Sequence, residues 1–263
     1  MNTLITIPFS PYNEKARWAL DRFGVPYRER AYMPALHFPA LMIATRFGRH
    51  GRSDRGSSRF STPFFVSSDG ERLADSCDIV RWVDERYADE HTTLYPSDDV
   101  AQLERELGET LGVDARCIAY GLAVGDGGDR LVWMARHNTG PVQTAIVRVM
   151  GGPILKMIKR SLRIDTARVE RAIVRVEARF AEIGARLEHN RYLLGDRLTA
   201  ADLAFASMAS TVLLPTRAEG FGAELPPLEA MEGPATDLAR RLRATPAGKW
   251  AMRMFAEQRR ARA

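Results

Sequence analysis

The β-strand signals of this 263-residue sequence are confined to its first 87 residues, and this uneven distribution restricts the possible folds more than any other feature. Residues 4–9 are apolar and bounded by prolines, as expected of a buried strand. A helical pattern then ends at Gly24, which suits the left-handed turn that closes a helix. Residues 27–32 predict a second strand, so the chain is expected to open with a βαβ unit.

A second pair of strands completes the expected sheet. Residues 64–66 predict one strand, Asp69-Gly70 is a hairpin turn signal, and residues 71–74 predict the return strand. Ser76 then begins a helix. The apolar face of that helix is expected to comprise Ile79, Val80, Val83 and Tyr87. Before this pair, residues 46–60 are rich in Arg, Gly and Ser and predict a loop.

The rest of the chain carries helical patterns without strand signals. Residues 88–98 lack periodicity and contain a proline, so they predict a linker. We therefore expect an α/β domain over residues 1–87 and an all-α helical bundle over residues 99–263.

Three features inside the helical half make local predictions. A 4-3-4-3-4 stripe predicts a helix facing the bundle core. The stripe comprises Val169, Ile173, Val176, Phe180, Ile183 and Leu187. Thr199 fits an N-cap with Asp202 at the third helical position, an acidic capping box. The sequence Gly151-Gly152-Pro153 is expected to kink or split the helix that contains it.

Composition narrows the class of protein. The chain is 45% hydrophobic and 27% charged, as globular proteins are, and it has no apolar run long enough to span a membrane. We expect no secretory signal, no disulfide between Cys77 and Cys117, and a cytoplasmic location. The five histidines are scattered, so no metal site is expected. The net charge of +5 is compatible with anionic partners, but the basic residues are mostly arginines, as expected of a protein from an arginine-rich proteome. The loop of residues 46–60 also has few of the aromatic residues that stack on nucleic-acid bases. We therefore predict no nucleic-acid partner.

Four segments resemble the glutathione S-transferase family when taken in order. They are SPYNEKARWALDRFG (10–24), STPFFV (61–66), LADSCDIVRWVDERY (73–87) and YLLGDRLTAADLAFA (192–206). The first is similar to the serine-containing start of the tau and zeta classes. The resemblance implies a thioredoxin-like N-terminal domain, an all-helical C-terminal domain, a homodimer, and a transferase role in detoxification.

The resemblance also implies a reaction in which the glutathione thiolate attacks an apolar electrophile, by conjugation, isomerisation or peroxide reduction. A free thiol has a pKa of about 8.5, so the protein must stabilise the thiolate. Ser10 would donate an O–H···S hydrogen bond at the start of a helix, with Tyr12 as the alternative donor and Asn13 as another neighbour to consider. From spacing alone, Ser10 followed by Pro11 is better explained as an ordinary N-cap, and it is the resemblance that favours the catalytic donor.

The expected glutathione site continues at two more positions. A cis Thr62–Pro63 bond, which the resemblance implies, would turn the Thr62 backbone toward the cysteinyl part of glutathione. Asp75 would accept from the α-ammonium group, and Ser76 with the helix N-terminus would hold the γ-glutamyl carboxylate, although Ser76 is also explained as a plain N-cap. Cys77 is expected to be buried packing.

Two parts of the expected site depart from the family. The Arg/Gly/Ser loop replaces the short helix that usually precedes the proline, and Arg59, Ser61 or His50 could hold the glycyl carboxylate in its place. Tyr120 and Trp133 are candidates for the apolar substrate site, or else ordinary core residues. The alternative to an enzyme is a non-catalytic binding module whose glutathione site is impaired by the loop.

Overall fold

The computed structural model describes residues 1–45, 60–122 and 128–259, and the first of these segments opens a small mixed sheet. The strands lie in the order β2-β1-β3-β4, with β1 parallel to β2 and antiparallel to β3. The strands are β1 (Asn2–Thr6), β2 (Tyr27–Ala31), β3 (Phe64–Val66) and β4 (Arg72–Leu73). All four expected strands are present. Strand β1 ends at Thr6 and β2 at Ala31, whereas the sequence predicted ends at residues 9 and 32.

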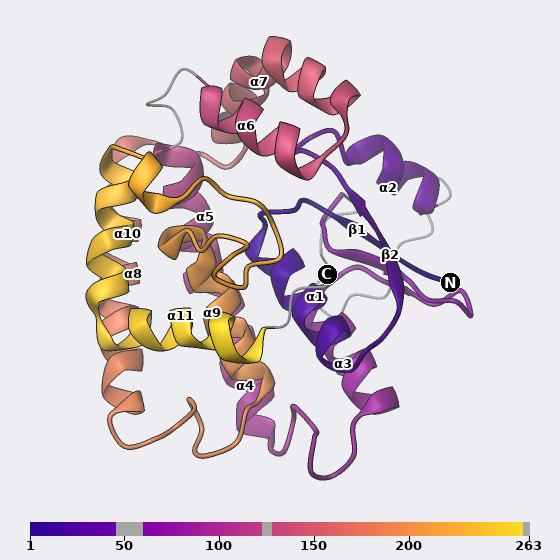
Figure 1. The fold of residues 1–263 in the computed structure, drawn as a ribbon, viewed down its shortest axis with the longest axis vertical. Coiled ribbons are helices and arrows are strands. Elements are labelled where there is room, and N and C mark those ends of the chain that lie inside the picture. The colour runs from indigo at the N-terminus through magenta and orange to yellow at the C-terminus, as the bar shows by residue number, and fades with distance from the viewer. Residues whose placement is uncertain (46–59, 123–127, 260–263) are drawn as a thin grey trace.

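Helices cover both faces of this sheet (Figure 1). Alternation along β1 sends Leu4 toward α1 (Pro11–Arg22) and α3 (Ser76–Tyr87), where it joins a core with Leu20, Ile79 and Val83. The next residue, Ile5, packs with Leu41 of α2 (Phe38–Ala44) on the other face. The sheet is therefore enclosed between α1 and α3 on one side and α2 on the other.

The second half of the chain is helical, which confirms the predicted fold class. Its α-helices are α4 (Asp98–Glu109), α5 (Leu111–Leu122), α6 (Asp129–Asn138), α7 (Pro141–Ser161), α8 (Thr166–Leu187), α9 (Ala200–Leu213), α10 (Pro234–Ala244) and α11 (Pro246–Gln258). Helix α9 is apolar on every side and lies at the centre, packed against α1, α4, α5, α10 and α11. The contact with α1 joins the helical half to the sheet-containing half.

Several local predictions are confirmed. Gly24 follows α1 with a positive φ of 64°, as a helix-closing glycine requires. The capping box forms at the start of α9, where the Asp202 carboxylate accepts from both the amide and the hydroxyl of Thr199. Val176, Phe180 and Ile183 of the α8 stripe are buried in the bundle core.

Three expectations need correction. A short helix does precede the proline: α2 was missed because only Leu41 of its seven residues is fully buried, which leaves no apolar period to detect. Tyr87 is 48% exposed and does not belong to the apolar face of α3. The third is only narrowed: of the kink and the split expected at Gly151-Gly152-Pro153, the split is wrong, since α7 runs through this sequence from Pro141 to Ser161.

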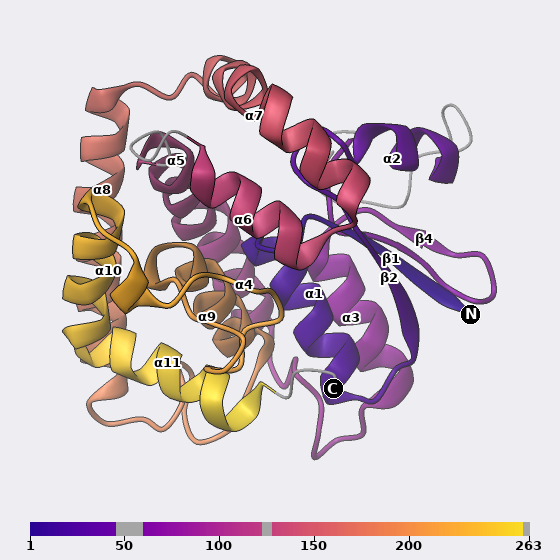
Figure 2. The same ribbon diagram turned by 45° about the horizontal axis from the view of Figure 1, so that its top comes forward.

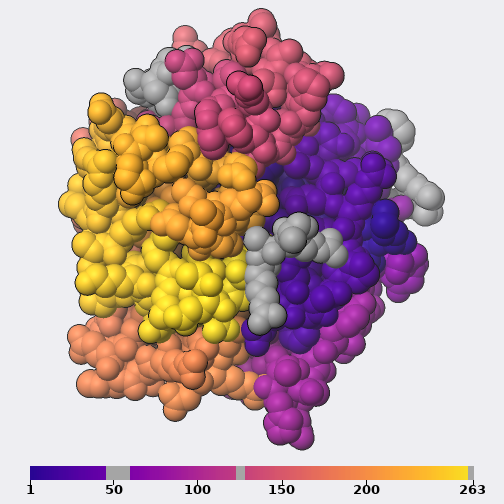
Figure 3. Space-filling model, in the orientation of Figure 1, coloured from indigo at the N-terminus to yellow at the C-terminus, as the bar shows by residue number. Residues whose placement is uncertain are grey.

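Helices α6 and α7 form a hairpin that leans over the sheet-containing half (Figures 2 and 3). The Gln143 side chain fixes it there, because its amide nitrogen donates to Ala31 O at 3.0 Å and its oxygen accepts from Met33 N at 2.9 Å. Met33 and Val147 are buried together beneath the hairpin, with Phe9 against them. The hairpin thus contacts the residue that directly precedes Ser10.

Candidate functional site

The ends of three strands bring the expected site residues to one edge of the sheet. Ile5 pairs with Phe64 across β1 and β3, so continuing this antiparallel register sets residue 7 opposite residue 62. Phe65 pairs with Leu73 across β3 and β4, which sets residue 63 opposite residue 75. The start of α1, the Thr62–Pro63 corner and the start of α3 therefore adjoin one another.

Ser10 occupies the N-cap of α1. Its backbone is extended, with φ −76° and ψ 131°, and Pro11 follows in the first turn. Its amide donates to Ile7 O at 2.9 Å, and its carbonyl accepts the first helical bond from Glu14 N at 3.0 Å. Its side chain makes no capping hydrogen bond, so the hydroxyl is not used in the way that makes serine a favourable cap.

Asn13 joins the start of α1 to the Thr62–Pro63 corner. Its side chain is fully buried, and its amide nitrogen donates to Ile7 O at 3.0 Å and to Thr62 Oγ1 at 3.1 Å. The Thr62–Pro63 bond is cis, as the family resemblance implies. The sequence suggests Asn13 only as a possible partner of the glutathione sulfur. In the structure, its two hydrogen bonds instead hold Thr62 beside the start of α1.

Tyr12 points away from that corner. Its hydroxyl donates to Gly108 O of α4 at 2.7 Å, so the phenol ties α1 to the helical half. Gly112 of α5 permits this approach, because a Cβ there would lie 2.6 Å from the Tyr12 hydroxyl oxygen. Of the two candidate sulfur donors, the geometry favours Ser10.

The start of α3 corrects the expected cap. Asp75, not Ser76, is the N-cap, and its Oδ1 accepts from Cys77 N at 2.8 Å. Ser76 is the first helical residue and is buried. In the sequence, either Asp75 or Ser76 could serve as the N-cap. Asp75 takes this position because its carboxylate accepts a stronger, charge-assisted hydrogen bond from the helix amide.

A buried charge cluster lies directly behind this helix start. Lys15 Nζ donates to Cys77 Sγ at 2.9 Å and to Glu104 Oε1 at 2.7 Å, and Glu104 also accepts from the Tyr95 hydroxyl at 2.9 Å. Burial acts to lower the pKa of Lys15, but the nearby Cys77, Glu104 and Asp75 raise it above the ordinary value. Lys15 is therefore a fixed positive charge between α1, α3 and α4, and Cys77 is its buried partner.

A second buried network holds α1 from the opposite side. Burial raises the pKa of Glu14, but Arg259 and Arg17 outweigh it and the pKa is lowered. The two guanidinium groups each lie 2.7 Å from a Glu14 oxygen. Arg259 also reaches Asp21 at 2.9 Å, and Arg17 donates to Pro8 O, just before Ser10. No local sequence pattern identifies Arg259 as a partner of α1.

Tyr120 and Trp133 lie in different surroundings. Tyr120 lines a small cavity of about 10 Å³ beneath α7, together with Met33, Pro34, Leu131, Val147, Gly151, Ile154, Leu155 and Ile158. Its burial raises the pKa of its hydroxyl. Trp133 stacks on His137 of the same helix, with ring centroids 3.8 Å apart. Tyr120, but not Trp133, lines this apolar cavity, which has about the volume that one water molecule needs.

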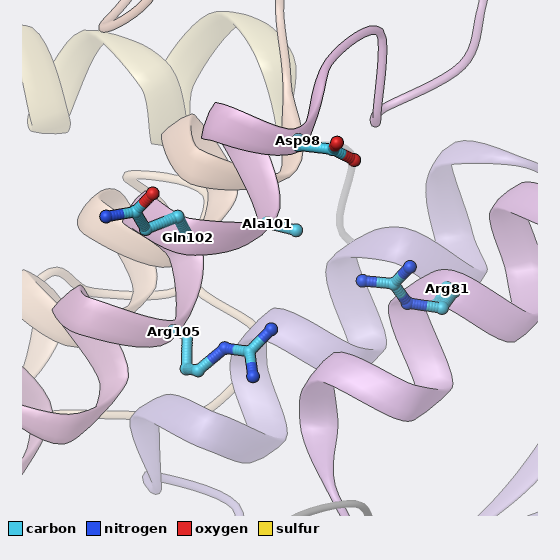
Figure 4. Close-up of a pocket in the computed structure, with 5 residues that line it drawn as sticks. All are labelled: Arg81, Asp98, Ala101, Gln102 and Arg105. Carbon is cyan, nitrogen blue, oxygen red and sulfur yellow. The ribbon is translucent and has the colours of Figure 1, made fainter.

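A larger open groove of about 420 Å³ lies between α3 and α4 and is lined by Arg81, Asp98, Ala101, Gln102 and Arg105 (Figure 4). Neither this groove nor the smaller cavity includes Ser10 or Thr62. Among the residues that the structure describes, no three His, Cys, Asp or Glu side chains are grouped as metal ligands. No helix in the described segments could cross a membrane.

Of the three candidates for the glycyl carboxylate, Ser61 lies in the described part of the chain. His50 and Arg59 lie outside the described residues, and Ser61 is half-buried. A histidine that the sequence did not single out lies close to Ser61: His37 caps α2, and its Nε2 is 3.0 Å from Phe60 O. Burial lowers the pKa of His37, so its neutral form is favoured.

Comparisons with known proteins identify the fold. Residues 166–230 match the family model of the glutathione S-transferase C-terminal domain. The structure of a glutathione S-transferase from Ceriporiopsis subvermispora, in complex with glutathione, is 16% identical and has a TM-score of 0.63 over 99% of this chain and 98% of that one. The chain therefore has the glutathione S-transferase fold.

Two further structures of this family are similar over nearly the whole chain. GSTFuA3 from Phanerochaete chrysosporium is 20% identical, with a TM-score of 0.63 over 100% of this chain and 98% of that one. A theta-class glutathione S-transferase from Xanthomonas axonopodis pv. citri, with glutathione bound, is 18% identical, with a TM-score of 0.52 over 95% and 96%. No curated protein is detectably similar in sequence. These structural similarities show a shared fold and do not assign the chain to a class of glutathione S-transferases.

Proposed function

We propose that this glutathione S-transferase-fold protein is a glutathione-dependent transferase in which Ser10 stabilises the glutathione thiolate for attack on an apolar electrophile. The observation that carries the proposal is the Ser10 hydroxyl, which sits at the N-terminus of α1 but makes no capping hydrogen bond. A hydroxyl in this place is available to donate to a sulfur anion. Tyr12, whose hydroxyl is bonded to α4, is the less suitable donor.

The chemistry requires only a modest electrostatic effect. Lowering a thiol pKa by two units needs about 2.7 kcal/mol of preferential stabilisation of the thiolate. A hydrogen bond to a charged group contributes about 1.5–3 kcal/mol, and the positive end of a helix adds about 0.3–1 kcal/mol. Ser10 acts as a donor and not as a base, because its own proton is far too weakly acidic to leave. The electrophile then forms its new bond to sulfur and its leaving group departs.

The rest of glutathione is proposed to lie along the sheet edge. The Thr62 backbone, held by Asn13, would pair with the cysteinyl peptide group. The amide groups at the start of α3, including that of Ser76, would bind the γ-glutamyl carboxylate. Asp75 uses Oδ1 for its cap, and its second oxygen would accept from the α-ammonium group. Neighbours of this fold crystallised with glutathione support the assignment of the ligand.

The wider setting is also proposed. The apolar electrophile would enter beside Tyr120, under the α6–α7 hairpin, and the small cavity there would have to widen to admit it. We propose a cytoplasmic homodimer of detoxifying function, in the tau- or zeta-like part of the family.

A non-catalytic glutathione-binding module is the second candidate. The observation that favours it is the α6–α7 hairpin, which packs on Phe9 and Met33 beside the proposed electrophile entry. In that case the protein would bind glutathione, as measured by titration calorimetry, and would not accelerate its reaction with any aryl halide or isothiocyanate.

The deciding experiment is a pH–rate profile of wild type and Ser10→Ala with glutathione and a generic aryl halide. Losing the O–H···S bond should raise the pKa of the bound thiol by one or two units and lower kcat/KM near pH 6.5 by about 10- to 100-fold. The deficit should shrink at high pH, where glutathione ionises unaided. Ser97→Ala is the matched control, because Ser97 is also an N-cap serine without a side-chain cap bond. Parallel profiles for Ser10→Ala and wild type would reject the thiolate role.

A further inference from the structure

Helix α7 exposes a continuous apolar stripe to solvent. Val142, Ile146, Val149 and Met157 follow one another at helical spacing and are 72%, 38%, 76% and 50% exposed. Val147 and Gly151, on the opposite side of the same helix, are buried against the rest of the molecule. A helix that is apolar on both sides is normally buried within a protein or against another surface. We therefore expect the outer stripe of α7 to be covered by a binding partner.

The charge of this segment is uniformly positive. Residues 141–163 contain no Asp or Glu and contain five basic residues, namely Arg148, Lys156, Lys159, Arg160 and Arg163. Lys156 and Arg160 are exposed and lie on or beside the apolar stripe. Lys159 reaches toward the protein, where its Nζ donates to Gly121 O at 3.3 Å. An apolar stripe flanked by basic residues, with no acidic residue nearby in the segment, is complementary to a surface that combines an apolar layer with negative charge.

This combination argues against a second copy of the chain as the occupant. A symmetric contact brings the same patch of two subunits together, so a dimer through this stripe would bring two wholly cationic segments against each other. No carboxylate of the same segment could compensate them. A lipid bilayer with anionic headgroups meets both requirements, because its acyl boundary takes the apolar residues and its phosphates face the cations.

We infer that the outer face of α7 binds anionic membrane surfaces with the helix lying in the plane of the headgroups. No described helix is suited to span a membrane, so this attachment is peripheral. The hairpin occupies one end of the molecule (Figures 1 and 2), and Gln143 fixes it to the sheet-containing half. The face can therefore meet a flat surface while the fold beneath it stays intact.

The test is flotation of the purified full chain with phosphatidylcholine vesicles, with and without phosphatidylserine. Wild type should float with the anionic vesicles at low salt, and high salt should release it, since each Lys or Arg near an anionic surface strengthens binding about five-fold. Val149→Asp should weaken this binding about ten-fold or more, because it removes an inserted apolar group and adds a repelled charge. Lys156→Glu combined with Arg160→Glu should weaken it by about 25-fold or more, because two attracted charges are lost and two repelled ones are added.

The matched control is Val174→Asp, an equally drastic change at a 66% exposed valine of α8. It should float as wild type does, which separates the α7 face from a general effect of surface charge. The inference is overturned if wild type does not float with anionic vesicles at low salt, or if Val149→Asp floats equally well. It is also overturned if light scattering shows that Val149→Asp dissociates an oligomer, because the stripe would then be covered by a second copy.

Discussion

Replacing Arg259 by alanine should destabilise the protein far more than the loss of one arginine on the surface. Its side chain is 1% exposed and lies 2.7 Å from Glu14 and 2.9 Å from Asp21. Removing one partner of a buried ion pair costs about 3–5 kcal/mol, because the remaining charge stays buried without compensation. Arg17 still contacts Glu14 in the variant, so we expect the lower end of this range, about 3 kcal/mol.

Urea unfolding followed by circular dichroism measures this loss. The control is Arg241→Ala, which breaks an ion pair with Glu177 in which Arg241 is 59% exposed, and it should cost less than about 1 kcal/mol. A loss below about 1 kcal/mol for Arg259→Ala would refute the reasoning, since the pair would then be no stronger than one at the surface.

The pH dependence gives an independent check. The folded-state pKa of Glu14 lies below its unfolded value of about 4.3, so this group stabilises the fold above that pH and the stabilisation is lost as the pH falls through the folded pKa. Without Arg259, burial is opposed mainly by Arg17 and the pKa of Glu14 rises. The deficit of Arg259→Ala should therefore be largest near neutral pH and smaller at about pH 3. A deficit that stays constant over this interval would contradict the assignment.

Two other predictions concern packing and capping. Gly112→Ala should lower the free energy of unfolding in urea by about 1–3 kcal/mol, because its Cβ would lie 2.6 Å from both the Tyr12 hydroxyl oxygen and Met208 Sδ. The control Gly152→Ala has open space at its Cβ and should be neutral or stabilising by up to about 1 kcal/mol. Equal effects of the two substitutions would contradict this prediction. Burial raises the pKa of Asp202 to about 6, above its unfolded value of about 3.9, so the stability of the fold should fall as the pH rises between these two values. Asp202→Asn cannot ionise, so its free energy of unfolding should lack this pH dependence, and it should lose about 1–2 kcal/mol of capping stabilisation. Identical slopes for the two proteins would show that the carboxyl titrates normally.

The parts of the fold that the sequence predicts are those governed by local rules. Gly24 ends α1 because a positive φ is needed there, and Thr199 with Asp202 starts α9 because their spacing lets each satisfy the other's backbone. The order of strands and helices follows from changes of apolar period. The Asp75 cap was misassigned by one position because adjacent Asp and Ser both satisfy the same rule.

The parts that could not be predicted depend on residues far apart in the chain. Lys15 meets Glu104, and Gln143 meets Ala31 and Met33, only after the two halves have packed. Of the candidate site, the cis Thr62–Pro63 corner was predicted through the family resemblance, and the role of Ser10 stays a prediction. The sequence could not identify the role of Asn13, whose hydrogen bond to Thr62 depends on how α1 leaves the sheet.

The pairing of Arg259 with Glu14 has a consequence for synthesis of the chain. The two residues are separated by 245 positions, and ribosomes add about 5–20 residues per second, so Glu14 is made roughly 10–50 s before its partner. During that interval α1 carries a carboxylate whose burial is only partly compensated. The helix that bears Ser10 therefore reaches its final stability late in translation, and a nascent chain stalled before residue 259 should leave this helix open to chaperones and proteases.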